Sequence, residues 1–394
     1  MKAVAVVGGS LAGLSAARAL RKQGFDGAVT IVSDESRPPY DRPPLSKSFL
    51  AGATTEAEIA LLVDGEDLGA DWRTGVTATR LDPRGRRVEL SDGSALAVDG
   101  LVIATGARPR RPWPRMPAGV HVLRTLDDAL GLRARLFAGA RLVVVGAGFI
   151  GAEVASTAHG LGVEVTVIEA APTPLSGPLG IDIGAVVSAL HADHGVRLLS
   201  GVGVAGLVGE AQIEGVELTD GRTIAADAVL LGVGVQPNVE WLTGSGLPLT
   251  GGVQCDSYGA TGIPNVVAVG DCATWYDREL GAHHRIEHWT AARERGAIAV
   301  SSLLSGGTER VEGRPPYFWS DQYGRTLQVA GHTSGAESAT VEEGSVQDRD
   351  FLAVYRRGGE PVAVVALGHG RSFMRWRKQL ARRAVSVPPS ALSR

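Results

Sequence analysis

The apolar residues of this chain twice follow the same order of strand, glycine-rich loop, helix and strand. The runs "KAVAVV" at 2–7 and "LVVV" at 142–145 are short and rich in Val, as is typical of fully buried parallel strands. Each run leads into glycines, then into a segment whose apolar residues recur at helical spacing, and then into a second apolar run. This order predicts two βαβ units in one chain.

The first glycine loop, Gly8 to Gly13, follows the strand at 2–7 and resembles a dinucleotide-binding G-x-G-x-x-G motif. Gly8 permits the tight turn, and Gly13 permits close packing of the helix on the strand. Ser10 replaces the middle glycine, so the loop alone could be an ordinary βα turn. The helix that follows, the strand at 28–33 and Asp34 at its end favour a nucleotide site, with Asp34 accepting hydrogen bonds from a ribose.

The second loop carries the full motif, with Gly146, Gly148 and Gly151, and Glu169 closes the next strand. A carboxylate at that position binds the ribose 2′-hydroxyl of NAD and repels the 2′-phosphate of NADP. The residues that follow, "AAPTPL", supply no arginine for that phosphate. We therefore expect NADH rather than NADPH here, and FAD and NAD(H) as the two dinucleotides of one enzyme.

Two further buried runs lie at 99–112 ("DGLVIATGARPRRP") and 263–275 ("IPNVVAVGDCATW"). From Gly313 onward the pattern changes to short strands with turns between them, followed by the basic helix "SFMRWRKQLARR". We expect an α/β protein with an FAD-binding domain at 1–110 and 238–312. An NAD(H)-binding domain at 111–237 is inserted into it, and an α+β interface domain follows at 313–394.

Composition narrows the functional classes. The chain has 394 residues, a net charge of −3 and 21% charged residues, which argues against a nucleic-acid-binding protein. No apolar run reaches the length of a membrane helix and no targeting segment is visible, so we expect a soluble cytoplasmic protein. Cys255 and Cys272 form no zinc pattern. His284 and His288 are spaced i, i+4, but without the H-E-x-x-H order we expect no metal site.

Several blocks resemble one family along nearly the whole chain. They are "PPYDRPPLSK" (38–47), "LVIATGARPR" (101–110), "LRTLDDA" (123–129), "VVVGAGFIGAEVA" (143–155), "VGVQPN" (233–238), "VAVGDCA" (267–273), "RIEHW" (285–289) and "FWSDQY" (318–323). The chain resembles the NADH-dependent ferredoxin reductases of the putidaredoxin reductase and aromatic-ring dioxygenase reductase family. These belong to the FAD-dependent pyridine nucleotide-disulfide oxidoreductase superfamily but lack the redox disulfide. The resemblance implies a glutathione-reductase-like fold with two Rossmann-like domains and a small α+β C-terminal domain.

The resemblance also implies residue roles. On the FAD side it implicates Gly8, Ser10, Gly13, Asp34, Arg42, Lys47, Val76, Arg124, Asp271 and Trp289. On the NAD side it implicates Gly146, Gly148, Ile150, Gly151, Glu153, Glu169 and Gly234. Lys47 and Glu153 are the candidate catalytic residues, expected to pair near the flavin and the nicotinamide. Two alternatives stay open: Lys47 could be a solvated surface charge, and Asp271 could cap the following helix.

The missing cysteines point to the electron acceptor. Residues 38–50 contain no cysteine, so no thiol pair can relay electrons from the flavin. We expect NADH to reduce FAD, and FAD to pass single electrons to a [2Fe-2S] ferredoxin that serves a cytochrome P450 or a Rieske oxygenase. The alternatives are an NADH oxidase or rubredoxin reductase on the same scaffold, or a flavin-dependent redox-sensing interaction protein.

Basic residues are candidates for docking an acidic ferredoxin, because complementary charge raises the rate of encounter. They are Arg371, Arg375, Arg377, Lys378, Arg382 and Arg383 in the basic helix, with Arg108, Arg110 and Arg111 near the flavin domain. The same helix could equally be a solvated cationic face. We expect a monomer or a homodimer.

Overall fold

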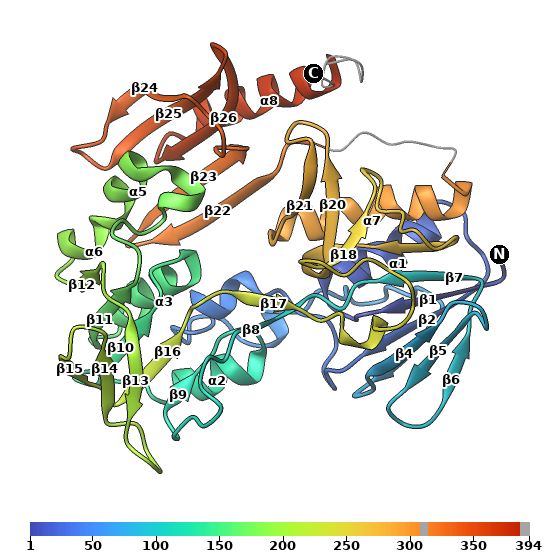
Figure 1. Cartoon of the computed structure of the whole chain (residues 1–394), viewed down its shortest axis with the longest axis horizontal. Helices are drawn as coiled ribbons and strands as arrows, with labels where there is room; N and C mark the ends of the chain where they lie inside the picture. Colours follow the sequence, from blue (N-terminus) through green and yellow to red (C-terminus); the bar gives the residue numbers. More distant parts are fainter. Residues whose placement is uncertain (308–313, 387–394) are drawn as a thin grey trace.

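A computed structural model describes residues 1–307 and 314–386 of the chain (Figure 1). Its sheets fall into three groups, which occupy the right, the lower left and the upper left of Figure 1. The expected boundary between residues 312 and 313 lies outside the described residues, as does the end of the last expected domain.

The first group is built on a parallel sheet. Its strands, in spatial order, are β19 (Val266–Ala268), β7 (Gly100–Ile103), β1 (Ala3–Val7), β2 (Ala28–Ser33) and β3 (Ala70–Thr74). The runs predicted as buried strands at 2–7, 99–112 and 263–275 supply β1, β7 and β19. Helices α1 (Leu11–Lys22) and α7 (Trp289–Ser305) pack side by side, and a Cβ at Gly296 would lie 3.0 Å from the backbone nitrogen of Ala16. Residues far apart in sequence therefore complete one core.

Smaller elements surround this sheet. They are β4 (Ala78–Asp82), β5 (Arg87–Leu90) and β6 (Ala95–Ala97) in one antiparallel sheet, β18 (Val253–Cys255), β20 (Ala273–Asp277) and β21 (Ala282–Arg285) in another, and the short helices η1 (Pro43–Ser46), η2 (Ala57–Ile59), η3 (Glu240–Leu242) and η4 (Gly270–Cys272). The β20–β21 hairpin points toward the C-terminal sheet (Figure 1).

The second group repeats the parallel arrangement. Its strands, in spatial order, are β12 (Arg197–Ser200), β11 (Glu164–Glu169), β10 (Arg141–Val145), β16 (Ala228–Leu231) and β9 (Val120–His121). Helices α2 (Leu126–Arg133), α3 (Phe149–Gly160), α4 (Ser176–Leu179), α5 (Ile181–Ser188) and α6 (Leu190–Asp193), with a small sheet of β13 (Val204–Val208), β14 (Gly215–Leu218) and β15 (Thr223–Ala225), complete it. The chain enters and leaves through the antiparallel pair β8 (Ala107–Pro109) and β17 (Val235–Pro237).

The third group is one antiparallel sheet with a helix. Its strands, in spatial order, are β22 (Tyr317–Gln322), β23 (Arg325–Gly331), β26 (Glu360–Leu367), β25 (Asp350–Arg357) and β24 (Ser338–Ser345), followed by α8 (Gly370–Ser386). Alternate residues face opposite sides. Leu327, Val329 and Val365 pack on α4 to α6 of the second group, whereas Val354 and Val364 pack on α8. One face of the sheet is thus anchored to the second group, and the other is covered by α8 (Figure 1).

Helix α8 explains the irregular apolar spacing of the basic segment. Phe373 and Leu380 are buried against the sheet and Trp376 is partly buried, while Met374 is 52% exposed. The helix therefore uses an i, i+3, i+7 stripe. Across the described ranges, none of the helices has an apolar stretch long enough to cross a membrane.

Candidate functional site

The first glycine loop is shaped by close backbone contacts. Gly8 has a φ of +118°, and a Cβ there would lie 2.0 Å from the carbonyl oxygen of Ala104, while a Cβ at Gly13 would lie 1.8 Å from that of Gly8. Only glycine fits such approaches. Ser10, the N-cap of α1, makes no side-chain capping bond, so the first N–H groups of this 12-residue helix remain available to an anion. The loop thus fits the pyrophosphate of a dinucleotide.

A polar rim borders this loop. The Arg42 guanidinium contacts the Glu35 carboxylate at 2.6 Å, donates to the Arg124 carbonyl at 2.5 Å and donates to the Ser10 hydroxyl at 3.2 Å. Tyr40 also donates to Glu35. The turn "YDRPPLS", stiffened by Pro43 and Pro44, therefore carries a positive charge to the start of α1.

Two acids follow β2, and they differ in surroundings. Asp34 is exposed, whereas Glu35 is half-buried and held by Arg42. Asp34 is the expected ribose ligand, whereas the ion pair of Glu35 with Arg42 was not predicted from the sequence. Val76 follows β3 and donates its N–H to the Ser33 carbonyl at 2.9 Å, which places its backbone beside the same strand end.

Three residues expected at the flavin end enter polar contacts. Arg124 and Asp271 form an ion pair at 2.7 Å, and the Trp289 indole donates to Asp41 at 2.6 Å. Burial raises the pKa of Asp41, although the bond from Trp289 opposes this shift. The alternative for Asp271 is wrong, because it lies in η4 and the N-cap of α7 is His288.

The second glycine loop repeats the close contacts. Cβ atoms at Gly146 and Gly151 would lie 2.4 Å from the Gly232 carbonyl oxygen and 2.1 Å from the Gly146 carbonyl oxygen. At Gly148, the N-cap of α3, a Cβ would meet no described atom within 4 Å. The turn is therefore as tight as the first, with open space where a phosphate approaches a helix start.

Glu169, the acid at the end of β11, is held by backbone N–H groups. The Glu169 carboxylate accepts from the N–H groups of Ala147 and Ala171 at 2.9 and 2.8 Å, and no described cation pairs with it. Ile150 is 48% exposed in the first turn of α3. Gly234 has a φ of +89°, and its carbonyl accepts from the Arg110 N–H at 3.0 Å beside the β8–β17 crossing.

Glu153 joins all three sheet groups. It lies in α3 and is 2% exposed. Its Oε2 accepts from the Ser46 hydroxyl at 2.5 Å and contacts the Lys47 ammonium at 2.7 Å, while its Oε1 accepts from the Ser320 hydroxyl at 2.7 Å. Each carboxylate oxygen therefore has a partner, as a buried charge requires.

This junction decides the alternative for Lys47. The lysine side chain is 20% exposed and ion-paired, so it is not a solvated surface charge. The expected Lys47–Glu153 pair forms. Ser46 and Ser320 were missed, since a serine hydroxyl gives no signal in sequence and Ser320 lies 167 positions from Glu153.

The two cysteines are buried and free. Burial raises the pKa of both the Cys255 and the Cys272 thiol, which favours the unreactive protonated form. They are small core residues beneath the first sheet.

Comparisons with known proteins decide the family. A family model described as pyridine nucleotide-disulphide oxidoreductase matches residues 2–296, and one described as reductase C-terminal matches residues 317–393. The chain belongs to the pyridine nucleotide-disulphide oxidoreductases, among their ferredoxin reductases. It is a flavoprotein oxidoreductase whose cofactors are FAD and NAD(H), which confirms the resemblance seen in the sequence.

Individual relatives cover almost the whole chain. The ferredoxin reductase component of chlorobenzene dioxygenase from Cupriavidus sp. (strain PS12) is 37% identical over 390 residues, covering 98% of this chain and 94% of its own. Rhodocoxin reductase from Rhodococcus erythropolis is 36% identical over 394 residues, covering 98% and 91%. The structure of a covalent putidaredoxin reductase–putidaredoxin complex matches with a TM-score of 0.92 at 33% identity, covering 97% of this chain and 93% of that one.

Proposed function

We propose that this chain is an NADH:ferredoxin reductase that transfers electrons from NADH through FAD to a [2Fe-2S] ferredoxin serving a cytochrome P450 or a Rieske-type oxygenase. The observation that carries the proposal is the pair of glycine loops linked through buried Glu153, in a chain whose two cysteines cannot relay electrons. FAD, when bound, supplies the chemistry that accepts a hydride and releases single electrons.

The first unit holds FAD. Gly8, Ser10 and Gly13 supply the backbone donors for its pyrophosphate, Asp34 and the backbone of Val76 serve the adenosine end, and Arg42 adds positive charge. Arg124, Asp271 and Trp289 serve the flavin end. In this assignment residues 1–110 and 238–312 form the FAD-binding domain, 111–237 the NAD(H)-binding domain and 313–394 the interface domain.

The second unit receives NADH. Gly146, Gly148 and Gly151 bring the start of α3 to the pyrophosphate, and Ile150 and Gly234 border the cofactor. Glu169 accepts from the ribose hydroxyls and repels a 2′-phosphate. We therefore propose a preference for NADH over NADPH.

Lys47 and Glu153 act at the junction of the two units. The Lys47 ammonium stabilises negative charge that develops near it on reduction, because a fixed charge is effective in a water-poor site. Glu153 positions Lys47, and Ser46 and Ser320 orient Glu153. No side chain needs to act as a general acid or base; the contribution of the protein is alignment and electrostatics.

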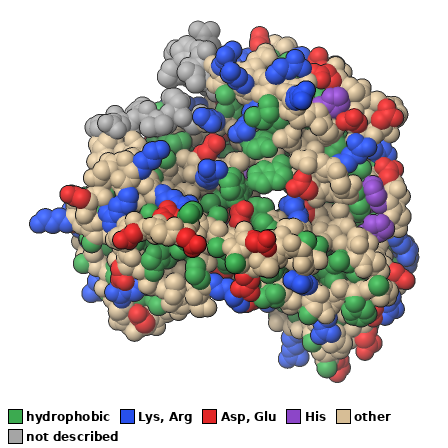
Figure 2. Space-filling model, turned by 180° about the vertical axis from the view of Figure 1, so that it is seen from behind, with side chains coloured by type: hydrophobic (Ala, Val, Ile, Leu, Met, Phe, Trp, Pro, Cys, Tyr) green, Lys and Arg blue, Asp and Glu red, His purple; other side chains and the backbone are tan. Residues whose placement is uncertain are grey.

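The ferredoxin docks through basic residues in this proposal. In the basic helix Arg371, Arg375, Lys378 and Arg382 are exposed. Arg375, Arg377 and Arg383 contact Glu343, the ring of Tyr317 and Glu360, respectively. Arg108 pairs with Glu240. Figure 2 shows Lys and Arg side chains along the upper edge of the molecule, over the C-terminal group. Arg371 and Lys378, together with Arg110 and Arg111, are therefore the better candidates for contact with acidic groups of a partner.

The test compares acceptors. The FAD-loaded chain is mixed with NADH and cytochrome c, with and without a [2Fe-2S] ferredoxin, while oxygen consumption is followed in parallel. We expect cytochrome c reduction to require the ferredoxin, and substitution of Arg371 and Lys378 by Glu to slow it most at low salt. Rapid oxygen consumption without ferredoxin would instead identify an NADH oxidase.

A further inference from the structure

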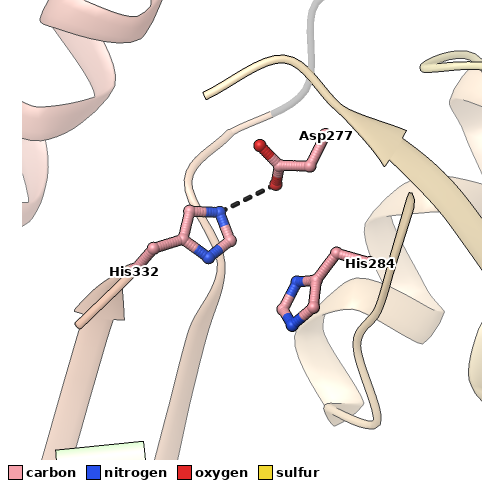
Figure 3. A group of neighbouring side chains, drawn as sticks. All are labelled: Asp277, His284 and His332. Atoms are coloured by element: carbon pink, nitrogen blue, oxygen red, sulfur yellow. Dashed lines mark ion pairs between the residues drawn. The ribbon is translucent and has the colours of Figure 1, made fainter. Parts of the chain in front are cut away.

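Two histidines and an aspartate outside both glycine loops converge where the C-terminal sheet meets the β20–β21 hairpin. Asp277 ends β20, His284 lies in β21, and His332 directly follows β23 (Figure 3). Figure 3 shows the three side chains pointing toward one another from separate segments. Among the described residues, no hydrogen bond, ion pair or ring contact joins these three to the residues assigned above to FAD or NADH.

The spacing suits one metal ion. One potential ligand atom from each residue lies within 4.8 Å of the other two. His332 Nε2 lies 2.8 Å from Asp277 Oδ2, and the two imidazole rings are 5.4 Å apart between centroids. Metal–ligand bonds of about 2.0 Å place tetrahedral ligand atoms about 3.3 Å apart. This separation lies between the 2.8 Å contact of His332 with Asp277 and the 4.8 Å within which all three ligand atoms lie. A small inward movement of His284 would complete the set.

The carboxylate is already oriented. The second oxygen of Asp277, Oδ1, accepts from the N–H groups of Glu279 and Leu280 at 2.9 and 3.1 Å in the hairpin turn. The other oxygen is thereby directed toward His332. Such backbone support of a ligand is common in metal sites.

A nitrogen in this group lacks a partner. His284 Nδ1 is buried and accepts or donates no hydrogen bond among the described residues. An unsatisfied buried imidazole nitrogen is unfavourable, and a ligand at that position would satisfy it. The i, i+4 spacing of His284 and His288 had suggested a helical pair, but His284 lies in a strand and His288 caps α7, so the two do not share a helix.

We infer that Asp277, His284 and His332 form a binding site for a divalent transition-metal ion, with Zn²⁺ the ion that two imidazoles and one carboxylate suit best. The ion takes the place of the direct contact between His332 and Asp277. The proposed site was not expected from the sequence, and it does not depend on the identity of the electron acceptor.

The neighbouring charges set the affinity. Asp277 is the negative ligand, and buried Arg295, which stacks over the ring of Trp275 at 4.6 Å, is a positive charge that acts on it. Arg295 opposes binding of a second cation, whereas the Glu279 carboxylate, two residues after Asp277, favours it. The affinity therefore depends on the balance of these charges.

The site lies between two sheet groups, so a bound ion would affect how they are held together. It ties the hairpin of the first group to the sheet whose β22 supplies Ser320 to Glu153 and Trp319 to an edge contact with Trp289. A bound ion would therefore stabilise the arrangement of the three groups without contacting either cofactor.

The test uses the FAD-loaded full chain without a polyhistidine tag, stripped with a chelator and dialysed against Zn²⁺. Metal content per chain and thermal unfolding are measured for the wild type, His284→Gln, His332→Gln and His283→Gln. His283 is the matched control, since it is the exposed neighbour of His284 in the same strand. The flavin spectrum of each variant verifies that it is folded.

We expect one Zn²⁺ per chain in the wild type and in His283→Gln, with a raised melting temperature in both. His284→Gln and His332→Gln should bind at least about tenfold more weakly and show no Zn²⁺-dependent shift. Absence of stoichiometric binding in the wild type, or binding that both variants retain, would overturn the inference. Equal loss in His283→Gln would do the same.

Discussion

The two glycine loops share their backbone geometry and differ in their surroundings. Both turn at a glycine with positive φ that leaves no room for a Cβ, and both lead into a 12-residue helix. Around the first loop lie the ion pairs Arg42–Glu35 and Arg124–Asp271. In the second, Glu169 is held by backbone N–H groups of its own loop, and Gly148 faces open space.

This difference fits one unit that keeps its dinucleotide bound and one that exchanges it. The first unit is closed by segments from distant parts of the chain, including η4 and α7, and is suited to a cofactor that stays bound. The second unit is formed mainly by one continuous stretch, and its loop has open space at Gly148, which fits the proposed cofactor that enters and leaves. In the proposed assignment, the ion pair of Glu153 and Lys47 connects the site of the cofactor that stays bound to the site of the cofactor that exchanges.

The largest effect should come from a methyl group in the first loop. Gly8→Ala places a Cβ 2.0 Å from the Ala104 carbonyl oxygen at a φ of +118°, so the turn must distort. We expect a loss of several kcal/mol in stability and of most bound FAD, measured by the flavin absorbance per chain.

The matched substitution is Gly148→Ala, where a Cβ meets no described atom within 4 Å. This variant should purify with full FAD and show only weakened NADH binding. If both variants lost FAD equally, the contrast between a closed and an open loop would be wrong.

The second-largest effect should come from the Lys47–Glu153 ion pair that joins the two units. Glu153→Gln keeps the shape of the side chain but removes the countercharge of Lys47 and replaces one acceptor oxygen by an amide nitrogen that can only donate. Misalignment at a buried junction typically costs about 100-fold in rate. We expect flavin reduction by NADH, followed by stopped flow, to slow by that order.

The control is Ser320→Ala, which removes one hydroxyl bond to Glu153 and retains the charges. It should slow the reduction less than Glu153→Gln. Equal rates in the wild type and in Glu153→Gln would show that the junction has no part in the transfer.

The stability of the second unit should depend on pH through His191. This residue lies in α6, and its Nδ1 forms a hydrogen bond with the hydroxyl of Tyr323 in the C-terminal group at 2.7 Å. Burial lowers the pKa of His191 to about 4, whereas the unfolded value is about 6.5. As the pH falls, His191 therefore takes up a proton at a lower pH in the folded state than in the unfolded state. The full contribution of the neutral, buried His191 to the free energy of unfolding is present above pH 6.5. It is lost as the pH falls from 6.5 toward 4, by about 2 kcal/mol at pH 5.

His191→Gln should flatten this part of the pH profile in urea unfolding, while His194→Gln, at an exposed neighbour, should not. An unchanged profile in His191→Gln would mean that the imidazole is not held neutral by burial.

The smallest effect concerns specificity. Glu169→Gln removes the charge that repels a 2′-phosphate, so the ratio of kcat/KM for NADH over NADPH should fall about tenfold, as steady-state kinetics with both cofactors would measure. Asp34→Asn, the corresponding change in the first unit, should leave this ratio unchanged. A shift of the ratio in Asp34→Asn would indicate that the cofactor assignment of the two units is reversed.

The sequence predicted the repeated elements well, because strand runs and glycine loops are local signals. The pattern did not predict β24. This edge strand is mostly exposed, includes Glu342 and Glu343, and has little alternation of apolar and polar residues. The sequence also missed contacts made across the fold. Ser320 reaches Glu153 and His332 reaches Asp277 only because the C-terminal sheet folds back onto the two units, and no spacing in the chain encodes that approach.

The most direct test of the central account is an anaerobic titration of the FAD-loaded chain with NADH, counting equivalents until the flavin absorbance is bleached. We expect one equivalent of NADH to bleach each FAD, with NADPH far less effective. Uptake of a second equivalent would reveal another redox centre and would contradict direct transfer from the flavin to a one-electron acceptor.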